Sequence, residues 1–186
     1  SGREVGVKDE LQLNEKSVKT MKGIEFFRDI TILACEGNEL THLDVSANTA
    51  LTWLCCYDNQ LTELDVSKNV KLTDLSCENN LLTSLDTSKN PELEYIDCYE
   101  NMLTALDFGN NPKLNNLKCS NNKLTVLDLS SNTAMRFLEC DRNPLESIII
   151  SCDADCRISC DDENVIAYGG AGSDGSTKAC EGHALG

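Results

Sequence analysis

The sequence has few aromatic side chains, few basic side chains and no apolar run long enough to cross a membrane. Its 186 residues include one tryptophan, four tyrosines and four phenylalanines, and 16 lysines and arginines face 31 aspartates and glutamates. The resulting formal charge of -15 argues against nucleic acid or an anionic membrane surface as a partner, and it favours cationic or neutral ligands. Without a membrane-spanning segment, we expect no membrane insertion.

Groups suited to catalysis are also scarce. The sequence holds two histidines, and it has no nucleophile-elbow, zinc-protease, phosphate-loop or dinucleotide-binding motif. His42 occupies a variable position whose counterparts are Glu63, Ser84, Ala105 and Val126, so we expect it to be exposed to solvent. We therefore predict that the protein is not an enzyme and that it binds no cofactor and no metal. The one catalytic alternative is a pair of carboxylates on the inner face that act as general acid and base.

What the sequence does contain is a repeat of 21 residues. Each unit follows the pattern L-x-x-L-x-C-x-x-N-x-L-T-x-L-D-V-S-x-N-x-x, and a regular period of this kind predicts a solenoid. The cysteine of the pattern falls at Cys35, Cys56, Cys77, Cys98, Cys119 and Cys140. Its first asparagine falls at Asn38, Asn59, Asn80, Asn101, Asn122 and Asn143, and its second at Asn48, Asn69, Asn90, Asn111 and Asn132.

The segments "LTWLCCYDNQL", "LTDLSCENNLL", "LEYIDCYENML" and "LNNLKCSNNKL" resemble the leucine-rich repeat family. More narrowly, the chain is similar to its short bacterial class, in which the second half of each repeat is a degenerate copy of the first. This resemblance implies parallel strands on a concave face and short strands or turns on the other side. It also implies a secreted or cell-surface protein used for adhesion and protein interaction, with its signal peptide absent from this sequence.

The repeat divides the chain into three parts. Residues 30–150 form the array of about six coils, and residues 1–29 form an N-terminal cap with a divergent first repeat. In that cap, Leu13 precedes Cys35 by 22 residues, which is close to the repeat period. Residues 151–186 form a cysteine-containing C-terminal cap and tail, in which 168–178 is predicted to be a flexible loop.

Side chains alternate along a strand, so neighbouring cysteines in "LCCY" have different surroundings. The repeated cysteines are predicted to point inward as small apolar residues that stay reduced and bind no metal. Cys55 is predicted to point outward, to be exposed and to react with alkylating reagents.

The repeated polar residues are predicted to be structural. The asparagine amides are expected to bond turn backbone groups of their own and neighbouring coils as a ladder. On the far side, leucine and valine should point inward while aspartate points outward. The aspartates Asp44, Asp65, Asp86, Asp107 and Asp128 would then form a column that either attracts calcium or bonds nearby backbone groups.

The tail carries four cysteines, Cys152, Cys156, Cys160 and Cys180. They suggest up to two disulfides and an extracellular setting, with zinc held by thiolates and nearby aspartates as the alternative. The segment "ESIIISCDADCRISC" is predicted to supply a last strand or two that caps the core.

The residues that face outward from the cysteine-bearing strands are not required for packing of the core. They include the only tryptophan, three of the four tyrosines, one phenylalanine, six acidic residues and one lysine. We predict a ligand-binding face there, made of Trp53, Tyr57, Asp74, Glu78, Tyr95, Asp97, Tyr99 and Phe137. Two alternatives require no binding site on this face. In the first, aromatic residues occupy outward strand positions because of their strand propensity; in the second, the array is a spacer in a surface protein.

Two ligand classes fit that face. The first is a protein or peptide partner with a basic segment, attracted by the carboxylates. The second is a glycan, whose sugar rings would stack on Trp53, Tyr57, Tyr95 and Tyr99. Binding that weakens with added salt would favour the basic peptide over the neutral sugar.

Overall fold

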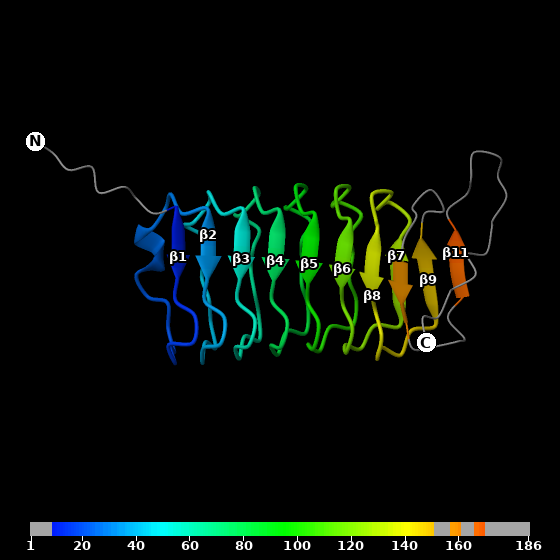
Figure 1. Ribbon diagram of the computed structural model, residues 1–186, viewed down its shortest axis with the longest axis horizontal. Coiled ribbons are helices and arrows are strands. Elements are labelled where there is room, and N and C mark those ends of the chain that lie inside the picture. Colours follow the sequence, from blue (N-terminus) through cyan, green and yellow to red (C-terminus); the bar gives the residue numbers. More distant parts are fainter. Residues whose placement is uncertain (1–8, 151–156, 161–165, 170–186) are drawn as a thin grey trace, which may run out of the picture.

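The computed structural model describes residues 9–150, 157–160 and 166–169, the last of these by their backbone alone. It is a solenoid in which successive coils stack along one axis (Figure 1). This is the leucine-rich repeat fold that the sequence predicts. The tail residues Cys152, Cys156, Cys180 and His183 lie outside the described residues, and so do the disulfide and zinc alternatives that depend on them.

Two parallel sheets run along the solenoid. Sheet A has the order β1-β2-β3-β4-β5-β6-β8-β10 and contains β1 (Glu10–Gln12), β2 (Ile32–Ala34), β3 (Trp53–Cys55), β4 (Asp74–Ser76), β5 (Tyr95–Asp97), β6 (Asn116–Lys118), β8 (Phe137–Glu139) and β10 (Arg157–Ser159). Sheet B has the order β11-β9-β7 and contains β7 (Val126–Leu129), β9 (Ser147–Ile150) and β11 (Ile166–Gly169). In the preceding coils, turns take the place of sheet B.

The register of sheet A places equivalent residues of each repeat side by side. Leu33 pairs with Leu54, Leu54 with Leu75, and the series continues through Ile96 and Leu117 to Leu138. These side chains and the cysteines two residues later are buried between the two sides of each coil. On the far side Leu43 and Val45 are buried and Asp44 is exposed, as the alternation predicts.

Both ends of the array are closed by atypical segments. At the N-terminal end, β1 pairs with β2 in the register Leu11 to Leu33, and a short 3-10 helix, η1 (Ile24–Phe26), packs Ile24 into the core. At the other end, β10 pairs with β8 and β11 pairs with β9. The strands β9 and β10 confirm the predicted last strands. The loop predicted at 168–178 is wrong at its start, because Tyr168 and Gly169 continue β11 through ladder bonds to β9.

The first asparagine of each repeat bonds the backbone of two coils. The side-chain amide of Asn59 donates to the carbonyls of Cys35, Cys56 and Tyr57, and its oxygen accepts from the backbone N–H of Leu40. The same four-bond pattern recurs at Asn80, Asn101 and Asn122. An apolar residue here would leave these buried groups without partners.

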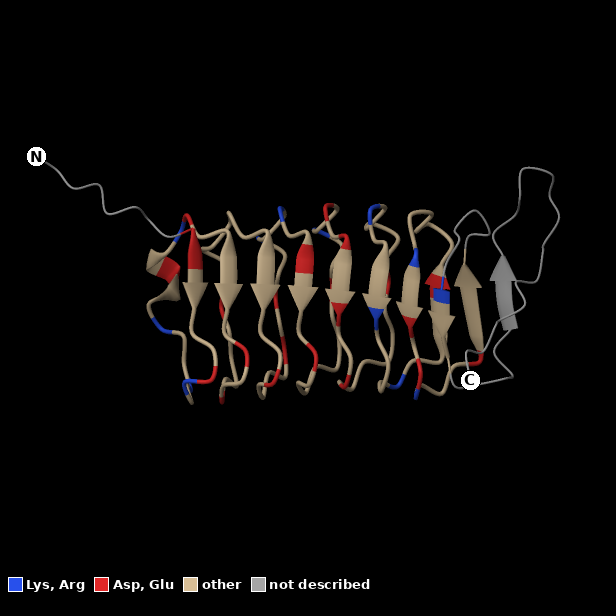
Figure 2. Ribbon diagram, viewed as in Figure 1, with Lys and Arg blue, Asp and Glu red and all other residues tan. Residues whose placement is uncertain are grey.

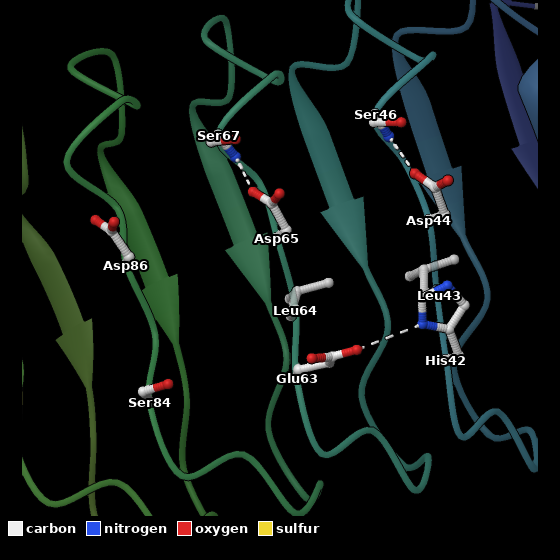
Figure 3. Close-up of a pocket in the computed structure, with 10 residues that line it drawn as sticks. All are labelled: His42, Leu43, Asp44, Ser46, Glu63, Leu64, Asp65, Ser67, Ser84 and Asp86. Carbon is white, nitrogen blue, oxygen red and sulfur yellow. Dashed lines mark hydrogen bonds and ion pairs between the residues drawn. The ribbon is translucent and has the colours of Figure 1, made fainter.

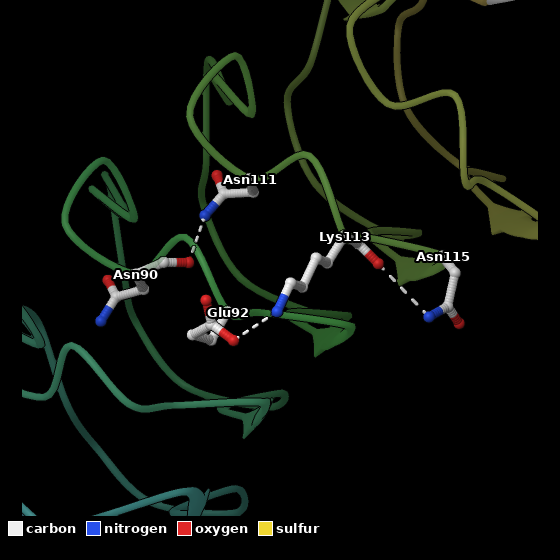
Figure 4. Close-up of polar contacts among 5 residues, drawn as sticks. All are labelled: Asn90, Glu92, Asn111, Lys113 and Asn115. Carbon is white, nitrogen blue, oxygen red and sulfur yellow. Dashed lines mark hydrogen bonds and ion pairs between the residues drawn. The ribbon is translucent and has the colours of Figure 1, made fainter.

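The second asparagine of each repeat is fully buried at the other end of the coil. Asn111 donates to the carbonyls of Thr87 and Asn90, at 3.0 and 2.8 Å, and Lys113 next to it forms an ion pair with Glu92 (Figure 4). The side-chain oxygen of Asn111 accepts a hydrogen bond from the hydroxyl of Thr87. The corresponding oxygens of Asn48, Asn69, Asn90 and Asn132 have no hydrogen-bond partner.

One backbone feature was not predicted. The residue three positions after the end of each sheet A strand from β2 to β8 has a positive φ, at Gly37, Asp58, Asn79, Glu100, Asn121 and Arg142. Glycine, asparagine and aspartate tolerate a positive φ best. Their presence at four of these six equivalent positions was the sequence signal that could have predicted this conformation.

The repeated cysteines are buried, as predicted, and Cys35, Cys56, Cys77, Cys98 and Cys119 form no disulfide. Burial raises the pKa of the Cys35 thiol to about 12, and the nearby Glu36 carboxylate adds to this effect. Within 9–150 and the short segments beyond it, no helix is long and apolar enough to span a membrane.

Candidate functional site

The outward side chains of sheet A, which we call the sheet face, form three columns along the solenoid. The first column is Ile32, Trp53, Asp74, Tyr95, Asn116 and Phe137, and the middle column is Ala34, Cys55, Ser76, Asp97, Lys118 and Glu139. The third column follows the strands and is Glu36, Tyr57, Glu78, Tyr99, Ser120 and Asp141. All eight predicted ligand-binding residues lie on this face. The register brings seven of them together on the neighbouring coils of β3, β4 and β5, whereas Phe137 lies on β8, which β6 separates from β5.

The sheet face is half-buried rather than fully exposed. Its large residues, among them Trp53 and Tyr57, are half-buried, and the small residues Ala34 and Cys55 of the middle column are buried. The prediction that Cys55 is exposed and reactive is wrong, because only 3% of this residue is accessible. Burial, together with the carboxylates of Glu36 and Glu78, raises the pKa of its thiol. Alternation correctly gave the side of the strand, but it could not show that neighbouring coils cover that side.

Asp97 holds the centre of the sheet face together. It is only 8% exposed, and its oxygens accept hydrogen bonds from the Tyr95 hydroxyl and the Tyr99 backbone N–H, at 3.1 and 3.2 Å. Lys118 approaches the same carboxylate at 3.9 Å. Burial and the Asp97 charge raise the pKa of Tyr95. The first contact orients the Tyr95 side chain and the second holds the backbone at Tyr99, so Asp97 supports the predicted site from beneath.

Several polar atoms of the sheet face have no partner. Nine buried side-chain oxygens in the described part of the chain lack one, and four of them belong to the second asparagine column. The other five are on the outward side of sheet A: an oxygen each of Asn14, Glu36, Glu78, Asn116 and Ser120. The backbone N–H of Glu15 donates to the carbonyl of Glu36, as that of Gly37 donates to the carbonyl of Tyr57, so Glu15 and Gly37 occupy equivalent positions. Asn14, which precedes Glu15, is therefore equivalent to Glu36 and belongs to the third column.

Glu78 has the most altered carboxyl group on this face. Burial raises its pKa from 4.5 to about 7, and the negative charges of Asp97 and Asp58 act in the same direction. Lys118 opposes the shift only weakly. Proton uptake by Glu78 near neutral pH is the response expected of a carboxylate that lacks a nearby cation.

The opposite side of the coils, which we call the aspartate face, carries a shallow groove of about 770 Å³ (Figure 3). Leu43 and Leu64 lie in it, and Asp44, Asp65 and Asp86 line it. His42 is exposed, as predicted, and its Nδ1 lies 3.8 Å from a carboxylate oxygen of Glu63. This groove was not predicted from the sequence, although the alternation of leucine and aspartate there was the available signal.

The aspartates of this face bond to their own turns. An oxygen of Asp65 accepts from the backbone N–H of Ser67 at 2.8 Å, and Asp44, Asp86, Asp107 and Asp128 make the equivalent bond. This bond lowers the pKa of Asp65. The pattern agrees with the side-chain-to-backbone alternative rather than with calcium. Among the residues that the structure places, no group of three or more histidine, cysteine, aspartate or glutamate side chains could hold a metal ion.

Charge is unevenly placed along the molecule, with acidic residues on both the strands and the turns (Figure 2). Within the 18 residues of the three columns, Lys118 is the only basic side chain. The sheet face therefore combines aromatic rings, unpaired carboxylate oxygens and little positive charge of its own.

Solved structures share this fold. The functional domain of InlJ from Listeria monocytogenes, which includes a cysteine ladder, is 31% identical over 80% of this chain and 45% of that one, with a TM-score of 0.61. A leucine-rich repeat protein of Leptospira interrogans is 22% identical over 85% of this chain and 43% of the other, with a TM-score of 0.75. The internalin InlF of Listeria monocytogenes is 18% identical over 81% and 51%, with a TM-score of 0.63.

The last two likenesses establish the fold alone. This chain spans about half the length of these structures or less. No protein-family model and no curated sequence matches it.

Proposed function

Because the chain is a leucine-rich repeat protein built from 21-residue coils, we propose that it is a non-catalytic recognition module whose sheet face binds a basic segment of another protein. The observation that carries this proposal is the content of the sheet face. Five aromatic side chains and six acidic ones share three columns with a single lysine. Half-buried aromatic anchors among carboxylates suit a partner that brings both apolar area and positive charge.

The position of the aromatic pairs sets the extent of the binding site. Trp53 and Tyr57 lie on one coil, and Tyr95 and Tyr99 lie two coils further along. Two strand spacings separate these pairs by about 10 Å, a distance that one extended peptide can bridge. Asp74 and Glu78 lie on the coil between them, where they would attract and orient basic residues.

The comparisons support an interaction or adhesion module in general terms, since the solved structures that the chain resembles include internalins. By the same likeness, we propose a secreted or cell-surface location. A glycan remains the second candidate, because the same rings can stack on sugars and the unpaired carboxylate oxygens can accept hydroxyl hydrogens.

The proposal is tested by probing peptide arrays of graded net charge, and a glycan array, with the natural protein and its variants. Trp53→Ala and Tyr95→Ala should each weaken binding of a basic peptide by about 2 kcal/mol. Phe26→Ala removes a ring that is 80% exposed outside the sheet face, so it serves as the matched control and should leave binding unchanged. Added salt should weaken the peptide complex.

The two ligand classes then separate by charge reversal. Asp74→Lys and Glu78→Lys should slow association with a basic peptide, whereas a neutral glycan should lose binding only if these carboxylates contact it. If alanine at Trp53 and Tyr95 leaves every array ligand bound as before, the sheet face is not the binding site.

A further inference from the structure

The third column of the sheet face alternates hydrogen-bond acceptors with tyrosines. Its first five members in coil order are Glu36, Tyr57, Glu78, Tyr99 and Ser120, and Asp141, which follows them, accepts from the Ser159 hydroxyl. Glu36 and Glu78 each keep one carboxylate oxygen that is buried and has no partner. Ser120 is 7% exposed, and its hydroxyl has no partner either. Each tyrosine is therefore flanked along the column by two polar groups that are unsatisfied in this protein.

The first of these units is compact. Both Glu36 and Glu78 act on the thiol of Cys55 and raise its pKa, and both also raise the pKa of Tyr57. Two carboxylates that come from coils on either side thus converge on the coil that carries Cys55 and Tyr57. The only basic residue of the face, Lys118, is engaged with Asp97.

Buried acceptors without partners are costly, so a ligand that donates hydrogen bonds to them gains more here than at an ordinary surface. A flat cation with several donors suits the arrangement, because it can lie over a tyrosine ring and donate sideways to both flanking groups. A guanidinium has this shape and five donors, whereas an ammonium is a compact and strongly hydrated point charge.

We infer that the sheet face recognises a pair of arginine side chains on one extended segment of the partner, one over Tyr57 and one over Tyr99. Glu36 and Glu78 flank the first guanidinium, and Glu78 and Ser120 flank the second. Glu78 serves both, since a carboxylate offers about four acceptor positions. This inference rests on the proposed function and names the chemistry of its partner.

The distance between the two tyrosines sets the spacing of the arginines. Tyr57 and Tyr99 are two coils apart, which is about 10 Å along the sheet. In a polyproline II segment, residues three apart point the same way and lie about 9 Å apart. The recognised pattern is therefore Arg-x-x-Arg in an extended conformation.

Proton release accompanies this binding. Glu78 has a pKa of about 7 in the free protein and is partly protonated at neutral pH. The charged groups that act on it are Asp97, Asp58 and Lys118, while Cys55, Tyr57 and Tyr95 stay neutral because their pKa values are raised. A guanidinium favours the ionised carboxylate, so affinity should rise as the pH increases from 6 to 8.

The test uses the peptide acetyl-Gly-Arg-Gly-Gly-Arg-Gly-amide together with its lysine and citrulline analogues. Trp53 is the only tryptophan and lies on the same face, so its fluorescence reports binding, and calorimetry in two buffers counts the protons released. The arginine peptide should bind at least about tenfold more tightly than the lysine peptide, and the citrulline peptide should not bind.

Glu78→Gln should weaken the arginine peptide at least about tenfold and abolish the pH dependence. Glu63→Gln, on the aspartate face, is the matched control and should change neither. Urea unfolding of both variants shows whether they are folded. Equal binding of arginine and lysine peptides, or unchanged binding by Glu78→Gln, would overturn the inference and indicate that these oxygens are merely hydrated.

Failure of this inference can be told apart from failure of the proposed function. Suppose that an array ligand without an arginine pair needs Trp53 and Tyr95 for binding and binds Glu78→Gln as well as the natural protein. This result would contradict the arginine inference and still support the proposed function. If no ligand depends on any residue of the sheet face, both fail.

Discussion

The two sides of each coil use polar residues in opposite ways. On the aspartate face five successive coils repeat one arrangement, in which an exposed aspartate accepts from the backbone two residues on. On the sheet face the outward residues change from coil to coil, and several keep buried oxygens without partners. Repetition therefore marks positions that satisfy the chain's own backbone, whereas variation marks positions that the fold does not require.

The sharpest test of this difference compares a repeated and a variable polar residue on the same coil. Asn80→Ala removes three donated bonds and one accepted bond from buried backbone groups, so it should cost about 3 kcal/mol, or over a hundredfold in the folding equilibrium. Ser76→Ala, at a variable position of β4, is the matched control and should stay within about 0.5 kcal/mol. Urea unfolding measures both, and equal midpoints would contradict the distinction.

The second test asks how the sheet face covers its small residues. Cys55 lies under the side chains of that face, while Cys77 lies in the core, and both are buried. A polar alkylating reagent should label both slowly, but Trp53→Ala should speed labelling of Cys55 at least about tenfold and leave Cys77 protected. Mass spectrometry of the labelled peptides reads the result. Rapid labelling of Cys55 in the natural protein would contradict its burial and show that the thiol is accessible in solution.

The third test uses the one departure from repetition near the aspartate face. Thr87 stands where other coils have an apolar residue, and its hydroxyl donates to the buried oxygen of Asn111. Thr87→Val should cost about 1 kcal/mol, because Asn111 would then resemble Asn90 and its unpartnered oxygen. The converse change, Val66→Thr, offers a donor to Asn90 and should not destabilise the protein. Thermal unfolding compares the two, and equal losses would contradict this account.

The smallest expected effect concerns the pH dependence of stability. Glu78 has a folded-state pKa of about 7, raised above its ordinary value of 4.5, so the folded protein holds the proton more tightly than the unfolded chain. Its contribution to stability is greatest below pH 4.5 and falls as the pH rises toward 7. Glu78→Gln should remove this fall, by about 1 kcal/mol or less, because partial exposure screens the group. Identical profiles of unfolding free energy against pH would contradict the shift.

The sequence predicted the fold well because the repeat itself is the fold. A constant spacing of leucine, cysteine and asparagine can be satisfied only if successive coils stack in register, and the pairing of Leu33, Leu54 and Leu75 follows from that. The sequence also placed all eight predicted ligand-binding residues on one face, since alternation along a strand fixes the side to which each residue points.

Burial on that face could not be predicted in the same way. Cys55 was expected to be exposed, yet it is buried. Asp97 is buried as well, and it accepts a hydrogen bond from the Tyr95 hydroxyl of its own strand. The groove on the aspartate face was missed for a related reason, because its shape depends on how far each side chain rises beside the next coil.

The sequence by itself thus determined the coil, the inward columns and the direction of every outward residue, because these depend on periodicity and on contacts that repeat. Only the tertiary structure decided which polar atoms find partners in other coils, since such a hydrogen bond needs two groups from distant parts of the sequence at the right distance. Glu36, Glu78 and Ser120 are identical in kind to many exposed residues of this chain. Their lack of partners arises from the stacking of the particular coils around Tyr57 and Tyr99.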